Sequence, residues 1–136
     1  MKIGIDVGGT KTEGILLNPN GTEIDRKRIN TEKSYDGTIN GILSIINHFE
    51  EKHGKAESVG MGMPGAISND TALIKNANSI WLNGKPFKQD LDKILNRNIK
   101  LRAIDLLNGQ SINKQFKELK PGTTLNQNDF ENLTLK

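Results

Sequence analysis

The sequence contains no cysteine and few aromatic residues. Without cysteine the chain can form no disulfide, use no thiol nucleophile and ligate no zinc through thiolates, so we expect no zinc site within it. Aromatic residues make up 4% of the chain, which leaves little to stack on bases. The net charge is only +3. The one basic cluster, DRKRIN (25–30), is interpreted as a solvated strand or turn. We therefore expect no nucleic-acid partner.

The sequence also lacks a long apolar run. A membrane-spanning helix needs about 20 consecutive apolar residues, and no stretch approaches that length. Strand-like sequence starts almost at Met1, so we expect no signal peptide and no membrane partner, and the cytoplasm is the expected compartment. A chain of 136 residues fits one domain, although it is short for an enzyme that encloses two substrates.

The first thirty residues have the pattern of consecutive β-strands. Alternating apolar residues predict a first strand that ends at Gly8. Further strands are predicted over residues 11–17 and 22–29, with a turn at NPNG (18–21) between them. The predicted order is therefore strand, glycine turn, strand, turn, strand.

The glycine turn nearly matches the phosphate-binding pattern G-x-x-x-x-G-K-[ST], and its residues are Gly8, Gly9, Thr10, Lys11 and Thr12. A true P-loop leads from a strand into a helix whose N-terminus faces the phosphates, whereas these glycines lead into a second strand. Successive backbone N–H groups can still form an anion-binding concavity without a helix. The pattern therefore favours either a phosphate loop at a hairpin turn or a tight glycine turn without a ligand.

Helical spacing of isoleucine, leucine and phenylalanine predicts a helix from Ser34 to His53. Ser34 is the expected N-cap and Gly54 the expected stop. His48 and His53 near its end are interpreted as exposed residues that suit the helix dipole, because no carboxylate–histidine constellation is evident.

Residues 58–63, SVGMGM, are predicted to form a buried strand that ends in a Pro64-Gly65 turn. Gly60, Gly62 and Gly65 match the dinucleotide pattern G-x-G-x-x-G. That fingerprint requires a helix to begin at the third glycine, and here the turn-forming stretch AISND follows instead. We therefore reject a dinucleotide site and expect a turn at which the backbone can approach a ligand closely.

A polar loop surrounds the only tryptophan, Trp81, with Asn76, Asn78, Ser79 and Asn83 close to it in sequence. Amides both donate and accept hydrogen bonds, and an indole packs on C–H surface, so the loop suits a polyhydroxylated ligand. The alternative is a polar loop with one anchoring aromatic residue. A second helix is predicted to follow over residues 86–95.

Three blocks, IDVGGTKTEGILL, GMGMPGAIS and KNANSIWLNGKPF, occur in this order along the chain. Together they resemble the ROK family of bacterial sugar kinases, most closely its fructokinase-like members, over residues 1–101. The resemblance implies an α/β fold: the N-terminal lobe of an actin-like, ribonuclease-H-like ATPase, with a mixed sheet begun by a three-strand meander and flanked by helices. ATP would bind between two such lobes.

The resemblance also implies roles for individual residues. Asp6 matches the acid that helps to hold Mg²⁺, often through water, and residues 8–12 match the first phosphate-binding loop. The sugar-side residues that match are Gly65, Ala66, Asn78, Trp81 and Asn83. The implied reaction transfers the γ-phosphoryl group of Mg-ATP to fructose or a related hexose, with glucose, mannose and N-acetylated hexosamines as alternatives.

The resemblance ends after Leu101. The family's catalytic acid lies in an Asn-Asp-Ala-Asn block, and the expected Asn-Asp falls on Ala103 and Ile104, one place before Asp105. A slip of one residue along a strand turns a side chain to the opposite face. Asp105 is therefore a weak candidate for the base that accepts the proton of the sugar hydroxyl.

We therefore expect residues 1–101 to form a ROK-like N-terminal lobe and residues 102–136 a divergent tail, as in a truncated or frame-shifted kinase without turnover. A non-catalytic module that binds nucleotide and sugar is the second hypothesis. A transcriptional repressor of the same family is the third and is less favoured, because such repressors place a helix-turn-helix before the first strand. A detached lobe would expose the surface that faces its partner lobe, which favours self-association such as a homodimer.

Overall fold

The computed structural model describes residues 1–96, 109–111 and 119–126 of the chain. The chain divides into two compact units, Met1–Phe87 and Lys88–Lys136. Asp105 and most of the predicted tail lie outside the described residues. Within the described part of the chain, no helix has the length and apolar character needed to cross a membrane.

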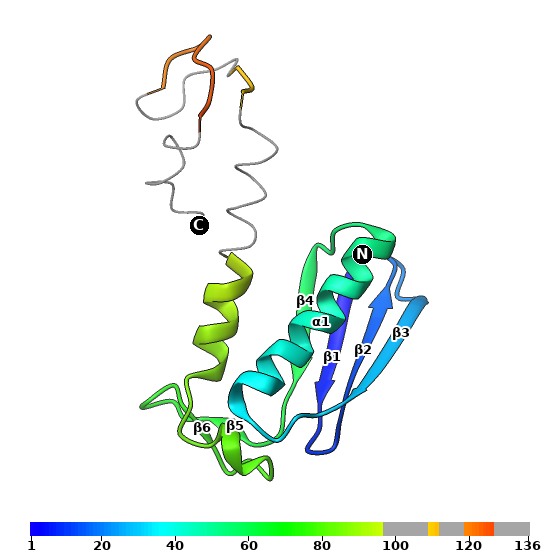
Figure 1. Cartoon of the computed structure of the whole chain (residues 1–136), viewed down its shortest axis with the longest axis vertical. Coiled ribbons are helices and arrows are strands. Elements are labelled where there is room, and N and C mark those ends of the chain that lie inside the picture. Colours follow the sequence, from blue (N-terminus) through cyan, green and yellow to red (C-terminus); the bar gives the residue numbers. More distant parts are fainter. Residues whose placement is uncertain (97–108, 112–118, 127–136) are drawn as a thin grey trace. The chain divides into compact units, whose positions relative to one another are not determined.

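The first unit contains a four-stranded mixed sheet in the order β3-β2-β1-β4 (Figure 1). The pairs β1–β2 and β2–β3 are antiparallel, whereas β1 and β4 run parallel. The mixed sheet and its opening three-strand meander are as predicted. The strands are β1 (Lys2–Val7), β2 (Lys11–Leu17), β3 (Glu23–Asn30) and β4 (Ser58–Gly62).

Helix α1 (Tyr35–His53) lies against one face of this sheet (Figure 1). Its first turn is capped by Ser34, whose Oγ accepts a hydrogen bond from the Gly37 N–H at 3.1 Å. Its C-terminal cap is Gly54, which has a φ of 86°. Both predicted caps are therefore confirmed.

The core lies between α1 and the inward-facing residues of the strands. Strand β2 presents Gly14 to the helix, where an added Cβ would lie 2.3 Å from Ile45 Cγ2 and 3.0 Å from Phe49 Cε2. A glycine at this place therefore lets α1 pack directly on the backbone of β2. The largest fully buried apolar side chains of the unit include Ile3, Leu16, Ile42, Ile45, Phe49 and Leu82.

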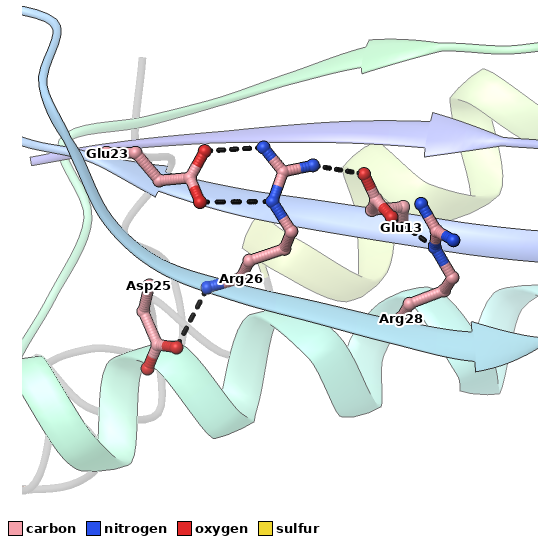
Figure 2. Close-up of polar contacts among 5 residues, drawn as sticks. All are labelled: Glu13, Glu23, Asp25, Arg26 and Arg28. Carbon is pink, nitrogen blue, oxygen red and sulfur yellow. Dashed lines mark hydrogen bonds and ion pairs between the residues drawn. The ribbon is translucent and has the colours of Figure 1, made fainter.

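The opposite face of the sheet carries paired charges (Figure 2). The Glu13 carboxylate of β2 accepts hydrogen bonds from both Arg26 and Arg28 of β3, and Arg26 Nε donates to Glu23 at 3.0 Å. Arg28 holds the pKa of Glu13 below its ordinary value, with Arg26 adding to the effect. The basic cluster is thus part of a solvated strand whose arginines are paired with glutamates.

Asp25 of β3 points the other way, toward α1 (Figure 2). Its Oδ2 lies 2.8 Å from His53 Nε2 and 2.9 Å from Lys52 Nζ, and His48 Nε2 lies 3.9 Å away. His53 and then Lys52 hold the pKa of Asp25 well below its ordinary value. The prediction that the helix histidines have no carboxylate partner was therefore wrong, because the partner comes from a strand 28 residues away in the sequence.

A small second sheet follows β4. Strand β5 (Ala66–Ile67) pairs antiparallel with β6 (Ile74–Lys75), and a short 3-10 helix η1 (Ile80–Leu82) comes after it. The stretch AISND was expected to be a turn, whereas its first two residues form β5 and the turn comes later. A further helix over residues 87–96 agrees with the predicted second helix.

Candidate functional site

The predicted phosphate and sugar segments leave the sheet at the same edge. Strands β1 and β4 are parallel neighbours, so their C-terminal ends lie side by side. Residues 8–10 follow β1, and residues 63–65 follow β4. This edge is where open α/β sheets commonly bind their ligands.

The glycine turn between β1 and β2 uses its two glycines differently. The Gly8 N–H donates to the Lys11 carbonyl at 3.0 Å, and a Cβ on Gly8 would lie 2.6 Å from that oxygen. Gly8 therefore shapes the turn. Within the described part of the chain, the N–H groups of Gly9 and Thr10 find no acceptor, and they are the amides of this turn that could receive an anion.

Thr12 lies inside the protein, with 2% of its surface exposed. Its Oγ1 is 2.8 Å from Thr31 Oγ1, and the Thr31 hydroxyl donates to the Gly8 carbonyl at 2.9 Å. The Thr31 N–H also donates to the Thr10 carbonyl at 2.9 Å. The Thr12 hydroxyl therefore stabilises the turn through Thr31, which binds the Gly8 carbonyl. Thr31 was not singled out from the sequence, because its partners lie about twenty residues away along the chain.

Asp6 is exposed on the face of the sheet opposite α1. Its neighbours in register are Glu13 on β2 and Gly62 on β4, and a Cβ on Gly62 would lie 3.5 Å from Asp6 Oδ1. The glycine thus leaves one flank of the carboxylate open. No cluster of three or more potential metal-binding side chains occurs in the described ranges. Mg²⁺ binds proteins through few carboxylates, and a role for Asp6 in holding it stays a prediction.

Gly65 is crowded by the chain's own backbone. Its φ is +84°, and a Cβ there would lie 2.6 Å from the Lys75 carbonyl oxygen and 2.8 Å from the Ala77 nitrogen. The close approach that was expected for a ligand is thus made by the segment that includes β6. A role for Gly65 and its neighbour Ala66 in holding a sugar stays a prediction.

Two residues of the polar loop hold the loop in place. The Asn83 amide forms a pair of hydrogen bonds with the Ala77 main chain, at 2.9 and 3.0 Å. The Trp81 indole N–H donates to Thr38 Oγ1 at 2.9 Å, which attaches the loop to the first turns of α1. Asn78 is exposed. The three residues of this loop that were predicted to face a sugar therefore divide into two that anchor the loop and one that is accessible.

The polar loop also reaches the glycine turn. A Cβ built on Gly9 would lie 3.5 Å from Ser79 Oγ. The structure thus brings together the predicted phosphate loop and the predicted sugar-side loop, although sixty-odd residues separate them in the sequence. From the sequence, Ser79 was noted only as one of the polar residues around Trp81, and its contact with the glycine turn was not predicted.

The mixed sheet, its meander and its glycine turn define an N-terminal lobe of the actin-like ATPase class. Comparison with protein-family models gives a match to the ROK family over residues 2–106. The chain belongs to the ROK family, as its three sequence blocks predicted.

Individual relatives agree with this assignment. An N-acetyl-D-glucosamine kinase from Haemophilus influenzae is 33% identical over 101 residues, which is 74% of this chain and 33% of the relative. The ROK family glucokinase from Streptomyces griseus, solved with glucose and AMPPNP, superposes with a TM-score of 0.61 at 24% identity, covering 70% of this chain and 30% of that one. The ROK hexokinase from Thermus thermophilus gives a TM-score of 0.54 at 20% identity, covering 67% and 30%. The chain spans about a third of the length of the curated relatives it matches.

Proposed function

We propose that this chain carries the phosphate loop and the sugar-side loop of an ATP-dependent hexose kinase. The observation that carries the proposal is the contact between the two loops, in which Gly9 lies against Ser79. A kinase must bring the terminal phosphate and the sugar hydroxyl together, and phosphoryl transfer depends mostly on such positioning and on neutralising charge. The residues named from the family resemblance would supply the positioning of the two substrates and part of the charge neutralisation.

Each part of the site has a proposed task. The N–H groups of Gly9 and Thr10 receive phosphate oxygens, and the exposed Lys11 adds positive charge beside them. Asp6 helps to hold Mg²⁺ with water and phosphate oxygens. On the sugar side, Asn78 is the accessible amide, whereas Trp81 shapes the loop that presents it.

The proposed substrate is a hexose or an N-acetylated hexosamine. The block KNANSIWLNGKPF resembles fructokinase-like members, which favours fructose. The curated relative from Haemophilus influenzae is an N-acetyl-D-glucosamine kinase, which favours N-acetylglucosamine. Both sugars therefore belong in the first binding experiment, with glucose and mannose as comparisons.

Turnover requires an acid that orients the sugar hydroxyl and accepts its proton. Asp105 lies outside the described residues, so its role stays a prediction. We propose that the 136-residue chain binds Mg-ATP and sugar without phosphorylating the sugar, and that turnover needs groups in the part of its relatives that it does not match. One side of a cleft buries little of a ligand, so the expected affinities are weak.

Isothermal titration of the purified chain with Mg-ATP, and separately with each sugar, tests this proposal. Asp6→Asn should weaken Mg-ATP binding, because it removes the carboxylate proposed for the metal. Asp70→Asn, which changes an exposed carboxylate on the turn before β6, is the matched control and should bind as the wild type does. Equal affinities in all three proteins would refute the role of Asp6. A folded chain that binds no nucleotide would refute the proposed site.

A coupled assay for ADP release separates a binding lobe from a working kinase. We expect no sugar-dependent ADP release from the chain alone. Clear turnover with one of the sugars would show that the chain, as a monomer or a self-associated form, supplies a complete active site. Asp105→Asn would then be the first variant to examine.

A further inference from the structure

Ser79 is the one side chain in the described ranges whose hydroxyl is buried without a hydrogen-bond partner. The residue is only 1% exposed. A buried hydroxyl without a partner destabilises a fold, and nearly all buried polar groups in native proteins are satisfied. Its presence in this loop therefore calls for a reason.

The position of Ser79 is fixed from both sides. Two residues before it, Ala77 is held by the pair of hydrogen bonds from Asn83. Two residues after it, Trp81 is bonded to Thr38. The hydroxyl is thus held against the glycine turn by contacts that do not involve the hydroxyl itself, which is the arrangement expected of a preorganised binding group.

The group that Ser79 faces is the tip of the glycine turn. The Oγ of Ser79 lies 3.5 Å from the place where a Cβ on Gly9 would be. The Gly9 N–H also has no acceptor within the described part of the chain. Two unsatisfied donors, one from each loop, therefore lie close together. An anion placed between them would satisfy both.

We propose that Ser79 Oγ donates a hydrogen bond to a phosphoryl oxygen when the glycine turn is occupied, which makes Ser79 a further phosphate-binding residue. This inference rests on the proposed function. A hydroxyl proton rotates to suit its acceptor, so the donor can turn toward an anion held by the Gly9 amide. Because Oγ is covered in the ligand-free chain, the turn must adjust locally, and glycine at this position permits that.

The hydrogen bond would also join the two ligand sites. Ser79 belongs to the sugar-side loop, between Asn78 and the 75% exposed Ile80. A phosphate that engages Ser79 would therefore fix the loop that presents the accessible amide to the sugar. The expected consequence is that Mg-AMPPNP increases the affinity for sugar in the wild type.

The test compares Ser79→Ala and Ser79→Cys with the wild type, and Ser44→Ala on the exposed side of α1 is the matched control. Thermal unfolding of each ligand-free protein is measured first, followed by titration with Mg-AMPPNP. Ser79→Ala removes an unsatisfied buried hydroxyl, so its Tm should equal or exceed that of the wild type, while its affinity for Mg-AMPPNP should fall roughly tenfold or more. Ser79→Cys keeps a weaker donor of similar shape and should bind with intermediate affinity. Ser44→Ala should bind as the wild type does.

The outcomes separate this inference from the proposed function. Wild-type binding of Mg-AMPPNP with unchanged affinity in both Ser79 variants would overturn the role of Ser79 and leave the kinase site standing. A lower Tm with unchanged affinity would identify a structural hydroxyl satisfied by buried water, which also overturns it. A folded wild type that binds no Mg-AMPPNP would overturn the nucleotide site and the inference together. Should Ser79→Ala fail to fold, reduced affinity in folded Ser79→Cys still supports the proposal, and wild-type affinity refutes it.

Discussion

Replacing Gly65 by alanine tests how closely the turn after β4 packs against the segment around β6. Gly65 has a φ of +84°, and an L-residue in that region costs about 1–2 kcal/mol. The new Cβ would also lie 2.6 Å from the Lys75 carbonyl oxygen and 2.8 Å from the Ala77 nitrogen. Backbone atoms cannot rotate away as a flexible side chain can, so overpacking adds about 1–3 kcal/mol. The expected loss is about 2–5 kcal/mol, from a domain stability on the order of 5–15 kcal/mol.

Gly84→Ala is the matched control for this prediction. Gly84 has a φ of +74° and no atom within 4 Å of its hypothetical Cβ, so the substitution costs only the backbone strain of about 1–2 kcal/mol. Urea unfolding monitored by circular dichroism gives the loss of unfolding free energy in both variants, from the shift of the midpoint at a common slope. Equal losses in the two variants would refute the reasoning, because the crowding around Gly65 would then contribute nothing.

Three further substitutions test other contacts. The histidine and lysine partners of Asp25 hold its folded-state pKa below the unfolded value, so its stabilising effect is present above about pH 4 and is lost as the pH falls through the lower folded pKa. Asp25→Asn should therefore lower the Tm at neutral pH, and the difference from the wild type should shrink toward about pH 2. Thr38→Val removes the acceptor of the Trp81 indole N–H, so it should cost about 1–3 kcal/mol and shift the emission of this single tryptophan; an unchanged spectrum would count against the contact. Gly14→Ala places a Cβ 2.3 Å from a helix side chain and should cost about 1–3 kcal/mol in urea unfolding. Gly60→Ala places a Cβ 4.0 Å from the Ile3 carbonyl oxygen and should change little.

The elements that the sequence predicted well are those specified by local patterns. Alternation over residues 2–7 marks the first strand, the threonine, isoleucine and leucine of residues 11–17 mark the second, and adjacent glycines mark the turn between them. Helix α1 is marked by its apolar spacing and by the caps at Ser34 and Gly54. Each of these signals lies within a few residues of the structure that it specifies, so no knowledge of the tertiary fold was needed.

The contacts that the sequence did not predict depend on strand register and on how distant segments pack. Asp25 faces α1 because it pairs in register with Leu16 of β2, whose side chain is buried against the helix. A shift of one residue would turn Asp25 outward. Thr31 supports the glycine turn only because β3 returns beside β2. Ser79 reaches Gly9 only because the loop is anchored on α1 through Trp81. None of these relations can be read from a short window of sequence.

Under the proposed function, the glycine turn would bind phosphate at a hairpin instead of at the start of a helix. In a P-loop the helix that follows adds its dipole and several free N–H groups. Here the chain continues into β2, and Gly8 gives its N–H to the turn itself, so the turn offers the amides of Gly9 and Thr10. Two amides offset little of the charge of a triphosphate, and under the proposed function Lys11 and Mg²⁺ at Asp6 would supply the remaining positive charge. Asp6 lies near the end of β1, and Gly9 lies in the turn that follows this strand. A change at either residue should therefore weaken nucleotide binding.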